Sequence, residues 1–202
     1  MEISKHIGKA LQVLQEGGVI AYPTETVYGL GCDPRDEEAV KRIFRIKKRE
    51  AGKPVLLVAG SLAQVRHIVR LEGNALALAQ RFWPGALTLV LPVLPGVRLA
   101  KRVVLRGEVA IRFSASPIVR KLTRRYGFPI VSTSANLSGE PACMSVNEIK
   151  ATFVSRKHAP DIVFDGGRLP GRKASTIVGF SASGEGEILR QGAVRISQSM
   201  LK

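Results

Sequence analysis

The sequence predicts an α/β fold, in which helices flank a twisted sheet of parallel and antiparallel strands. Segments with helical periodicity alternate with short apolar segments, and in places two apolar segments follow each other without a helix between them. No repeat, low-complexity block or Pro/Ser-rich linker divides the chain. Of its 202 residues 45% are hydrophobic, which is enough to bury a core. We therefore expect one domain over residues 1–202.

The N-terminal part predicts two helices, each followed by a strand. Residues 4–18 repeat apolar side chains with the spacing of an amphipathic helix, and two glycines end this helix. Residues 36–49 form the second predicted helix, with acidic residues at its start and basic residues at its end, as the helix dipole favours. The short apolar segments 19–24 and 53–60 are the two predicted strands.

The rest of the chain continues the alternation. Helices are predicted over residues 61–71, 74–82, 116–127 and 145–153, and strands over 87–93, 108–113, 128–133, 161–167, 175–180 and 187–192. Ser61 is the expected N-cap of the first of these helices. Ser145 and Glu148 have the spacing of a capping box at the start of the last helix.

The charge of the chain is strongly unbalanced. Its 31 Lys and Arg residues against 16 Asp and Glu residues give a formal net charge of +15. Such a surplus attracts polyanions such as nucleotides, phosphates and RNA. A surface charged only for solubility usually balances the two signs, so we expect an anionic partner.

Other features disfavour several classes of protein. No apolar stretch reaches the roughly 18 residues that a membrane helix needs, and the N-terminus lacks the apolar core of a secretory signal. Cys32 and Cys143 lack CxxC spacing, and three scattered histidines do not form a metal cluster. We therefore expect a cytoplasmic protein without a membrane, a disulfide framework or a protein-held metal site.

Two segments near the N-terminus contain residues suited to a ligand. In "YPTETVYGLGCDP" (22–34), two threonines precede Gly29 and Gly31, which permit a close approach of the backbone. The segment matches neither common glycine-rich nucleotide motif, and its residues alone favour a turn between a strand and a helix. In "IKKREAGKP" (46–54), four cations exceed what a solvated helix end needs and suit phosphate oxygens: Lys47, Lys48, Arg49 and Lys53.

Three other places are weaker candidates. Strand alternation places Arg112 on the opposite face from its apolar neighbours, where it either forms a structural ion pair or meets a ligand. The turn "STSAN" (132–136) offers hydroxyls and a carboxamide, but neither a nearby His–Asp pair nor GxSxG indicates a serine nucleophile. If these groups are functional, they hold a substrate. Ser175 and Arg190 lie in predicted strands and alone indicate little.

Taken together, these segments resemble the YrdC family of threonylcarbamoyl-AMP synthases. The matching segments include "GGVIAYPTETVYGLGCDP", "RFWPGALTLVL", "VAIRF", "STSANLSG", "ASTIV" and "EILRQGAV", and they span nearly the whole chain. The pair of motifs that marks the family, KxR and SxN, corresponds to Lys47-Lys48-Arg49 and Ser134-Ala135-Asn136. The chain is similar to the single-domain bacterial form.

The resemblance implies a YrdC-like fold with a basic concave cleft and a nucleotidyltransferase activity. The implied reaction joins L-threonine, bicarbonate or CO2, and ATP with Mg2+ into threonylcarbamoyl-AMP and pyrophosphate. A separate transfer complex would then modify adenosine at position 37 of tRNA, and direct binding of tRNA or double-stranded RNA is a further expectation.

The family's site residues carry over as follows. The implied catalytic residues are Lys47, Arg49, Ser134 and Asn136. The implied ATP contacts are Arg49, Lys53, Ser134, Asn136 and Arg190, and the implied threonine contacts are Thr26, Arg112, Ser132 and Ser175. Two positions depart from the family's pattern, because Glu50 replaces a common proline and Val58 replaces a histidine near the threonine.

Three alternatives stay open. An RNA-binding protein of ribosome or tRNA maturation would explain the charge, although no RNP motif or run of stacking aromatics is visible. A carbamoyl-handling enzyme such as the YrdC-like domain of hydrogenase-maturation proteins belongs to a longer chain with portions absent from this sequence. A YciO-like protein would differ at the KxR and SxN motifs.

Overall fold

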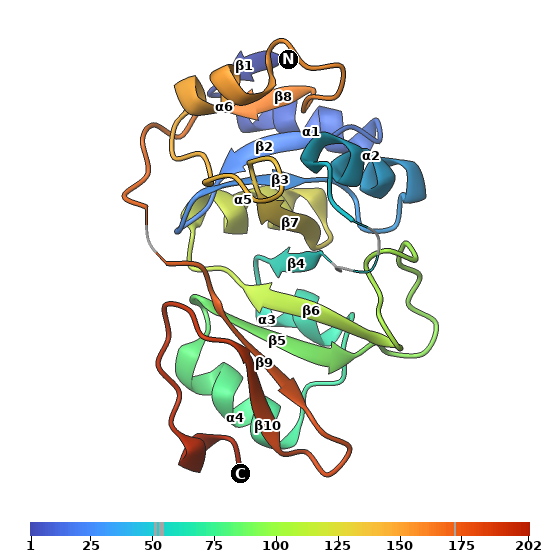
Figure 1. Ribbon diagram of the computed structural model, residues 1–202. Helices are drawn as coiled ribbons and strands as arrows, with labels where there is room; N and C mark the ends of the chain where they lie inside the picture. The colour runs from blue at the N-terminus through green and yellow to red at the C-terminus, as the bar shows by residue number, and fades with distance from the viewer. Residues whose placement is uncertain (51, 53–54, 172) are drawn as a thin grey trace.

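The computed structural model describes residues 1–50, 52, 55–171 and 173–202 (Figure 1). The strands are β1 (Glu2–Ser4), β2 (Ile20–Pro23), β3 (Tyr28–Gly31), β4 (Leu56–Ala59), β5 (Leu87–Pro92), β6 (Glu108–Phe113), β7 (Ile130–Ser134), β8 (Ile162–Phe164), β9 (Thr176–Phe180) and β10 (Gly186–Arg190). The helices are α1 (Ile7–Gln15), α2 (Glu37–Lys47), α3 (Leu62–Arg66), α4 (Gly73–Phe82), α5 (Pro117–Tyr126), α6 (Val146–Phe153) and the short 3-10 helix η1 (Gln198–Met200).

The described strands form one mixed sheet in the order β1-β8-β2-β3-β7-β4-β6-β5-β9-β10. Four neighbouring pairs are parallel, namely β1–β8, β2–β8, β4–β6 and β5–β9, and the other five are antiparallel. Strand β7 joins the two halves, because it pairs with β3 on one side and β4 on the other. The predicted α/β fold with a mixed sheet is confirmed.

Local sequence explains where the helices begin and end. Asp36 caps α2 by accepting hydrogen bonds from the backbone N–H groups of Glu38 and Ala39. Lys48 ends this helix in the left-handed conformation, with φ of 50°. Helix α5 begins with Ser116 as its cap and Pro117 in its first turn, where a missing N–H costs nothing.

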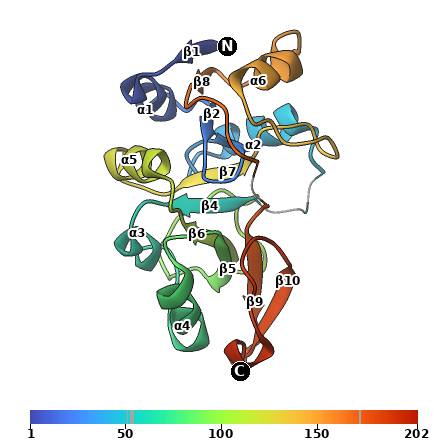
Figure 2. The ribbon, with the colours of Figure 1, turned by 90° about the vertical axis from the view of Figure 1, so that its left-hand side faces the viewer.

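Side chains of β2, β4, β7 and β8 alternate between two hydrophobic clusters on opposite faces of the sheet. In β2, Ile20 and Tyr22 pack in the cluster that contains α1 and α5, whereas Ala21 packs in the larger cluster with α2, α3, α4 and α6. Figure 2 shows α1, α5, α3 and α4 along one side of the molecule and α2 and α6 on the other side of its upper half.

In the lower half of the sheet, formed by β4, β6, β5, β9 and β10 (Figure 1), the same alternation leaves one face partly polar. In β6, Val109 and Ile111 pack in the larger cluster, so Ala110 and Arg112 point to the opposite face. Arg112 is in register with Val58 of β4, and Val58 packs under α1 and α5. Arg112 therefore lies on the same sheet face that α5 covers at Val58. Beyond α5, this face forms one wall of a cavity.

Two sequence predictions need correction. Residues 28–31 were expected in a turn, but they form β3, because pairing on both sides with β2 and β7 outweighs the low strand propensity of two glycines. Gly31 is required there, since an added Cβ would lie 2.8 Å from Val131 O. The helix predicted over 61–71 ends at Arg66, and Val69 instead bridges to Val93.

The capping box predicted at α6 is half correct. Ser145 Oγ accepts a hydrogen bond from the Glu148 backbone N–H, as expected. The Glu148 carboxylate accepts from the Met144 N–H one residue further back. The short strand β1, which was not predicted, forms because Glu2–Ser4 pair in parallel with β8.

Candidate functional site

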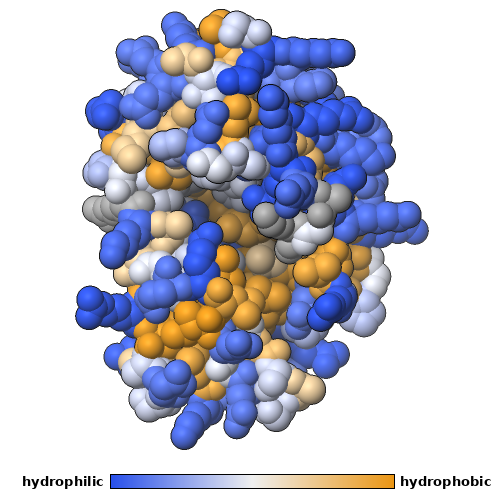
Figure 3. Space-filling model, viewed as in Figure 1, coloured by the Kyte–Doolittle hydropathy of each residue, from blue (hydrophilic) through white to orange (hydrophobic). Residues whose placement is uncertain are grey.

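A cavity of about 460 Å³ opens between the two halves of the sheet, within the size range typical of small-molecule sites. Figure 3 shows this face hollowed near its middle, with apolar side chains along the lower side. The described lining residues are Thr24, Thr26, Val27, Gly29, Arg49, Gly52, Val55, Leu56, Val90, Ala110, Arg112, Ser132, Thr133, Ser134, Ala174, Ser175, Ile177, Leu189 and Arg190. Among these there are three arginines and no acidic side chain.

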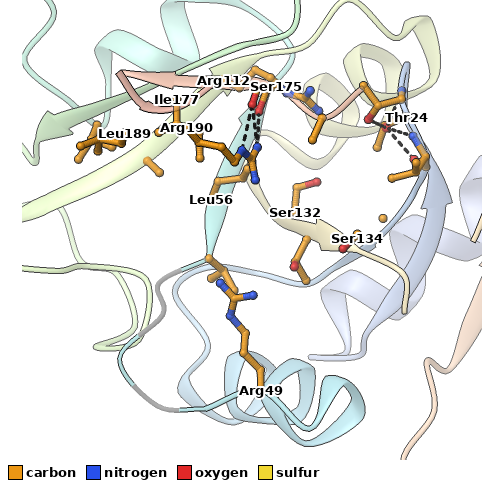
Figure 4. Close-up of a pocket in the computed structure, with 18 of the residues that line it drawn as sticks. Thr24, Arg49, Leu56, Arg112, Ser132, Ser134, Ser175, Ile177, Leu189 and Arg190 are labelled. Atoms are coloured by element: carbon orange, nitrogen blue, oxygen red, sulfur yellow. Dashed lines mark hydrogen bonds between the residues drawn. The ribbon is translucent and has the colours of Figure 1, made fainter. Parts of the chain in front are cut away.

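The cavity collects side chains from segments that are far apart in the sequence. Figure 4 shows Arg49 reaching in from the end of α2, while Arg190 of β10 lies on the opposite side of the cavity with its guanidinium turned toward Ser175. Strand β10 contributes two consecutive residues, Leu189 and Arg190, because its pairing with β9 shifts register between Ile188 and Arg190. Such a bulge re-aims a side chain that regular alternation would turn away.

Arg112 is the most buried of the three arginines, with 4% of its surface exposed. Its Nη1 lies 3.4 Å from Glu25 Oε1, and Glu25 also accepts a 2.8 Å hydrogen bond from Ser114 Oγ. The Arg112 Nε is buried and has no hydrogen-bond partner among the described residues. A buried guanidinium with an unused N–H is suited to a carboxylate or phosphate oxygen.

Arg190 is held by the strand beside it. Its Nε and Nη2 donate to the backbone carbonyl of Ser175, at 3.2 and 2.7 Å, and Nη2 lies 3.3 Å from Ser175 Oγ (Figure 4). Ser175 Oγ also lies 2.8 Å from Thr88 Oγ1. Burial lowers the pKa of Arg190, and the neighbouring positive charge of Arg112 lowers it further. Two like charges facing one cavity favour an anion between them.

The turn between β2 and β3 is organised by one hydroxyl. Thr24 Oγ1 donates to Val27 O at 2.7 Å and accepts from the Thr26 backbone N–H at 3.1 Å. Thr24 and Thr26 Oγ1 are 3.0 Å apart, so Thr26, which lines the cavity, donates its proton to Thr24. Thr24 thereby fixes the position of Thr26.

The KxR and SxN motifs meet at the end of β7, where Lys47 contacts Ser134 and Asn136. Lys47 is 2% exposed, and its Nζ donates to Ser134 O (2.5 Å), Asn136 O (3.0 Å) and Asn136 Oδ1 (2.8 Å). Asn136 Oδ1 also accepts from Ser134 Oγ at 2.6 Å, and Asn136 Nδ2 donates to Glu140 O. Burial and nearby Arg49 lower the pKa of Lys47 to about 8.

The predicted site residues therefore divide into two groups. The cavity brings together Thr26, Arg49, Arg112, Ser132, Ser134, Ser175 and Arg190. Lys47 and Asn136, expected as catalytic residues, are not in its lining and instead hydrogen-bond to each other. The expected contact of Lys47 and Asn136 with substrate stays a prediction, and in this structure Lys47 donates all three of its protons inside the protein. Lys53, an expected ATP contact, lies outside the described residues.

The two departures from the family's pattern lie away from the lining. Val58 is fully buried in the cluster with α1 and α5, and Glu50 is exposed. Near Val58, the Tyr22 hydroxyl is fully buried without a hydrogen-bond partner among the described residues, and burial raises its pKa. Neither position replaces a group that lines the cavity.

Sequence reasoning missed several contributors to the site. Glu25, the partner of Arg112, was identifiable only as part of the "PTET" segment, and nothing in its spacing from Arg112 indicates the contact. The apolar side of the cavity, formed by Val90, Ile177 and Leu189, was also missed. Alternation on β5 and β9 is the signal for the first two, since Val90 is in register with Ala110.

The described residues offer neither a membrane span nor a metal-ligand cluster. No helix within the described ranges is long and apolar enough to cross a bilayer. No group of three or more His, Cys, Asp or Glu side chains in the same residues is arranged to hold a metal ion.

Comparison with known proteins places this geometry in a family. The Sua5/yciO/yrdC family model, described as "Telomere recombination", matches residues 12–192. The threonylcarbamoyl-AMP synthase of Vibrio cholerae is 41% identical over 155 residues, which cover 74% of this chain and 80% of the relative.

Solved structures agree with the sequence comparison. P. abyssi Sua5 complexed with L-threonine matches with a TM-score of 0.81 and 35% identity over 95% of this chain. The match spans 56% of the P. abyssi chain, so this chain covers just over half the length of that relative. E. coli YciO matches with a TM-score of 0.79 and 27% identity, over 98% of this chain and 96% of YciO. The chain therefore belongs to the Sua5/YciO/YrdC family.

Proposed function

We propose that the protein is an L-threonylcarbamoyladenylate synthase, which forms threonylcarbamoyl-AMP and pyrophosphate from L-threonine, bicarbonate or CO2, and ATP. The observation that carries the proposal is the convergence of three arginines and several hydroxyls on one cavity with no acidic residue in its described lining. The V. cholerae relative bears this enzyme's name, and a related structure was solved with L-threonine.

The amino acid fits the inner end of the cavity, at Arg112. A threonine carboxylate would pair with the guanidinium of Arg112, which lines the cavity. Thr26 comes from the β2–β3 turn and, with its proton donated to Thr24, would accept from the threonine amine or hydroxyl. Ser132 of β7 and Ser175, just before β9, would offer further hydroxyls to the substrate.

The nucleotide fits the opening between the other two arginines. Arg49 and Arg190 lie on opposite sides of the cavity (Figure 4) and would meet the phosphates of ATP, and Ser134 would contact another part of the nucleotide. Lys53 remains a proposed ATP contact from the sequence motif. Lys47 and Asn136 act in this proposal by holding Ser134.

The residue types suit the chemistry. The threonine amine forms a C–N bond with CO2 and releases a proton, and the resulting carbamate oxygen attacks the α-phosphorus of ATP as pyrophosphate leaves. Both reacting groups are anionic, so neutralising and aligning charge contributes more than a strong base would. Three fixed arginines in a partly enclosed cavity supply that neutralisation.

Magnesium would enter with ATP. The described lining offers arginines and hydroxyls but no carboxylate, so it does not fit a metal held by the protein itself. The phosphates of ATP would be the principal ligands of Mg2+.

One assay tests the proposal. Purified protein receives Mg2+, ATP and bicarbonate, and pyrophosphate release is followed with and without L-threonine. We expect release only when threonine is present. Release that ignores threonine would contradict the function, and release that requires carbamoyl phosphate instead would favour the carbamoyl-handling alternative. Product formed here would be consumed by a transfer enzyme that modifies adenosine 37 of tRNA.

A second candidate function, RNA binding, is favoured by a basic groove between α1 and α5. Its lining contains Lys5, His6, Lys121 and Arg125, and no acidic side chain occurs in its described lining. Phosphate contacts along this groove would make RNA affinity fall with salt, by about 0.7–0.9 logarithmic units per contact for each tenfold rise. Substituting Lys121 and Arg125 with Gln would reduce that slope while threonine-dependent turnover continues.

A further inference from the structure

The hydrogen-bond network behind β7 determines which way the Ser134 hydroxyl can act. A lysine ammonium has three protons and no lone pair, so each of the three atoms around Lys47 Nζ must be an acceptor. The amide atom of Asn136 that lies 2.8 Å from Nζ is therefore its oxygen. The Asn136 nitrogen then faces Glu140 O, to which it donates. The orientation of the Asn136 amide is therefore fixed by two contacts: its oxygen accepts from Lys47 and its nitrogen donates to Glu140 O.

The orientation of Asn136 in turn determines where the hydroxyl proton of Ser134 lies. Ser134 Oγ lies 2.6 Å from Asn136 Oδ1, an atom with lone pairs and no proton. Ser134 must therefore donate in this contact, and a hydroxyl has only one proton to donate. The ammonium of Lys47 polarises the same amide oxygen and keeps it in place. What Ser134 presents to the cavity, whose wall it forms, is its lone pairs.

We propose that Ser134 binds the nucleotide only as a hydrogen-bond acceptor, so the group it meets is an O–H or N–H of the nucleoside and not a phosphate oxygen. A phosphate oxygen has no proton to give, and placing it against Ser134 would set lone pairs against lone pairs. Anionic oxygens are instead directed to Arg49 and Arg190, which carry only donors. Lys47 and Asn136 are positioning residues that act through Ser134. This inference rests on the proposed function in taking ATP as the ligand.

Comparing ATP with a ligand that has phosphates but no nucleoside tests the inference. Dissociation constants of ATP and of inorganic tripolyphosphate are measured without threonine for the parent protein, Ser134→Ala and Arg49→Gln. Ser134→Ala should weaken ATP binding roughly threefold to tenfold, the usual range for one neutral hydrogen bond, and leave tripolyphosphate binding unchanged. Arg49→Gln, as the matched control, should weaken both ligands. Thermal melting checks that each variant is folded.

ATP analogues that each lack one hydrogen-bond donor then identify the nucleoside group that donates to Ser134. The same measurement uses 2′-deoxy-ATP, 3′-deoxy-ATP and the triphosphate of purine riboside, which lacks the exocyclic amine. One analogue should bind the parent protein and Ser134→Ala equally, because the partner of Ser134 is already missing.

Three outcomes contradict the proposal and are distinguishable. Equal weakening of ATP and tripolyphosphate by Ser134→Ala would show contact with phosphate and overturn the inference while the proposed function stands. No weakening of either ligand, or equal sensitivity of all three analogues, would overturn it in the same way. Failure of the parent protein to bind ATP would overturn the proposed function and the inference with it.

Discussion

Lys47 and Arg49 are two residues apart at the end of α2, yet they belong to different environments. Lys47 turns behind β7, where three neutral oxygens accept its three protons. Arg49 lines the cavity, on the opposite side from Arg190 (Figure 4). The three protons of Lys47 are all donated within the protein, and Arg49 lines a cavity that also contains Arg112 and Arg190.

Lys47 and Arg49 belong to one motif, but their different surroundings suit them to different roles. Burying an ammonium is costly unless every proton is donated, and around Lys47 that condition is met without a ligand. Arg49, Arg112 and Arg190 surround one cavity whose described lining has no acidic side chain, which favours binding of an anion there. These surroundings are the basis for the proposed roles, in which Lys47 holds the SxN turn and the arginines bind substrate.

The largest expected effect is that of Arg49→Ala on turnover. Removing one preorganised donor to developing charge costs about 3–4 kcal/mol, so threonine-dependent pyrophosphate release should fall roughly 10²–10³-fold. The melting temperature is measured alongside turnover, so that a loss of ligand contact is separated from a loss of folding. Lys48→Asn is the control: it removes an exposed charge next to Arg49, and asparagine tolerates the left-handed backbone there. Near-parental turnover in Arg49→Ala would refute its role.

Lys47→Met should show the opposite balance, with a loss of stability as its primary effect. The substitution leaves Ser134 O and Asn136 O buried without their donor, although it also removes the cost of burying a charge. We expect the free energy of unfolding to fall by about 2–3 kcal/mol, measured by urea denaturation at unchanged m-value. An unchanged midpoint together with a large loss of turnover would mean that Lys47 contacts the substrate.

The smallest effect is expected in the pH dependence of ATP binding. The pKa of Lys47 is lowered to about 8, so raising the pH through this value removes a proton from the folded protein. One of the three donor bonds to the SxN turn is then lost, and the hold on Ser134 weakens. ATP affinity should decline roughly threefold to tenfold above pH 8, to a plateau, since one hydrogen bond is affected. Lys47→Met should lack this step, whereas persistence of the step in that variant would assign it to another group.

Sequence patterns predicted the elements whose periodicity is strong. Local spacing and caps are sufficient to predict helix α5 and strand β6. They also predict that Arg112 and Ile111 lie on opposite faces of β6. Strand β3 was missed, because its "YGLG" sequence has weak strand propensity and becomes a strand only through partners on both sides. Pairing between distant segments is not encoded in any local window.

The same limit applies to the site. The arginines and hydroxyls of the cavity were found from their motifs, and the structure brings them together. The inward turn of Lys47 was not predictable, because spacing along a helix end does not show which side chain will find acceptors on a strand 87 residues away. Glu25 was missed for the same reason, since its contact with Arg112 crosses between the two halves of the sheet.

The central claim is that the arginine-lined cavity joins threonine to AMP through a carbamate. The most direct test incubates the protein with Mg2+, ATP, L-threonine and isotopically labelled bicarbonate, and analyses the nucleotide products by mass spectrometry at early times. The proposed function predicts an adenylate that contains threonine and carries the label, and its near-absence with Arg49→Ala. Formation of AMP and pyrophosphate without a labelled, threonine-containing adenylate would contradict the claim.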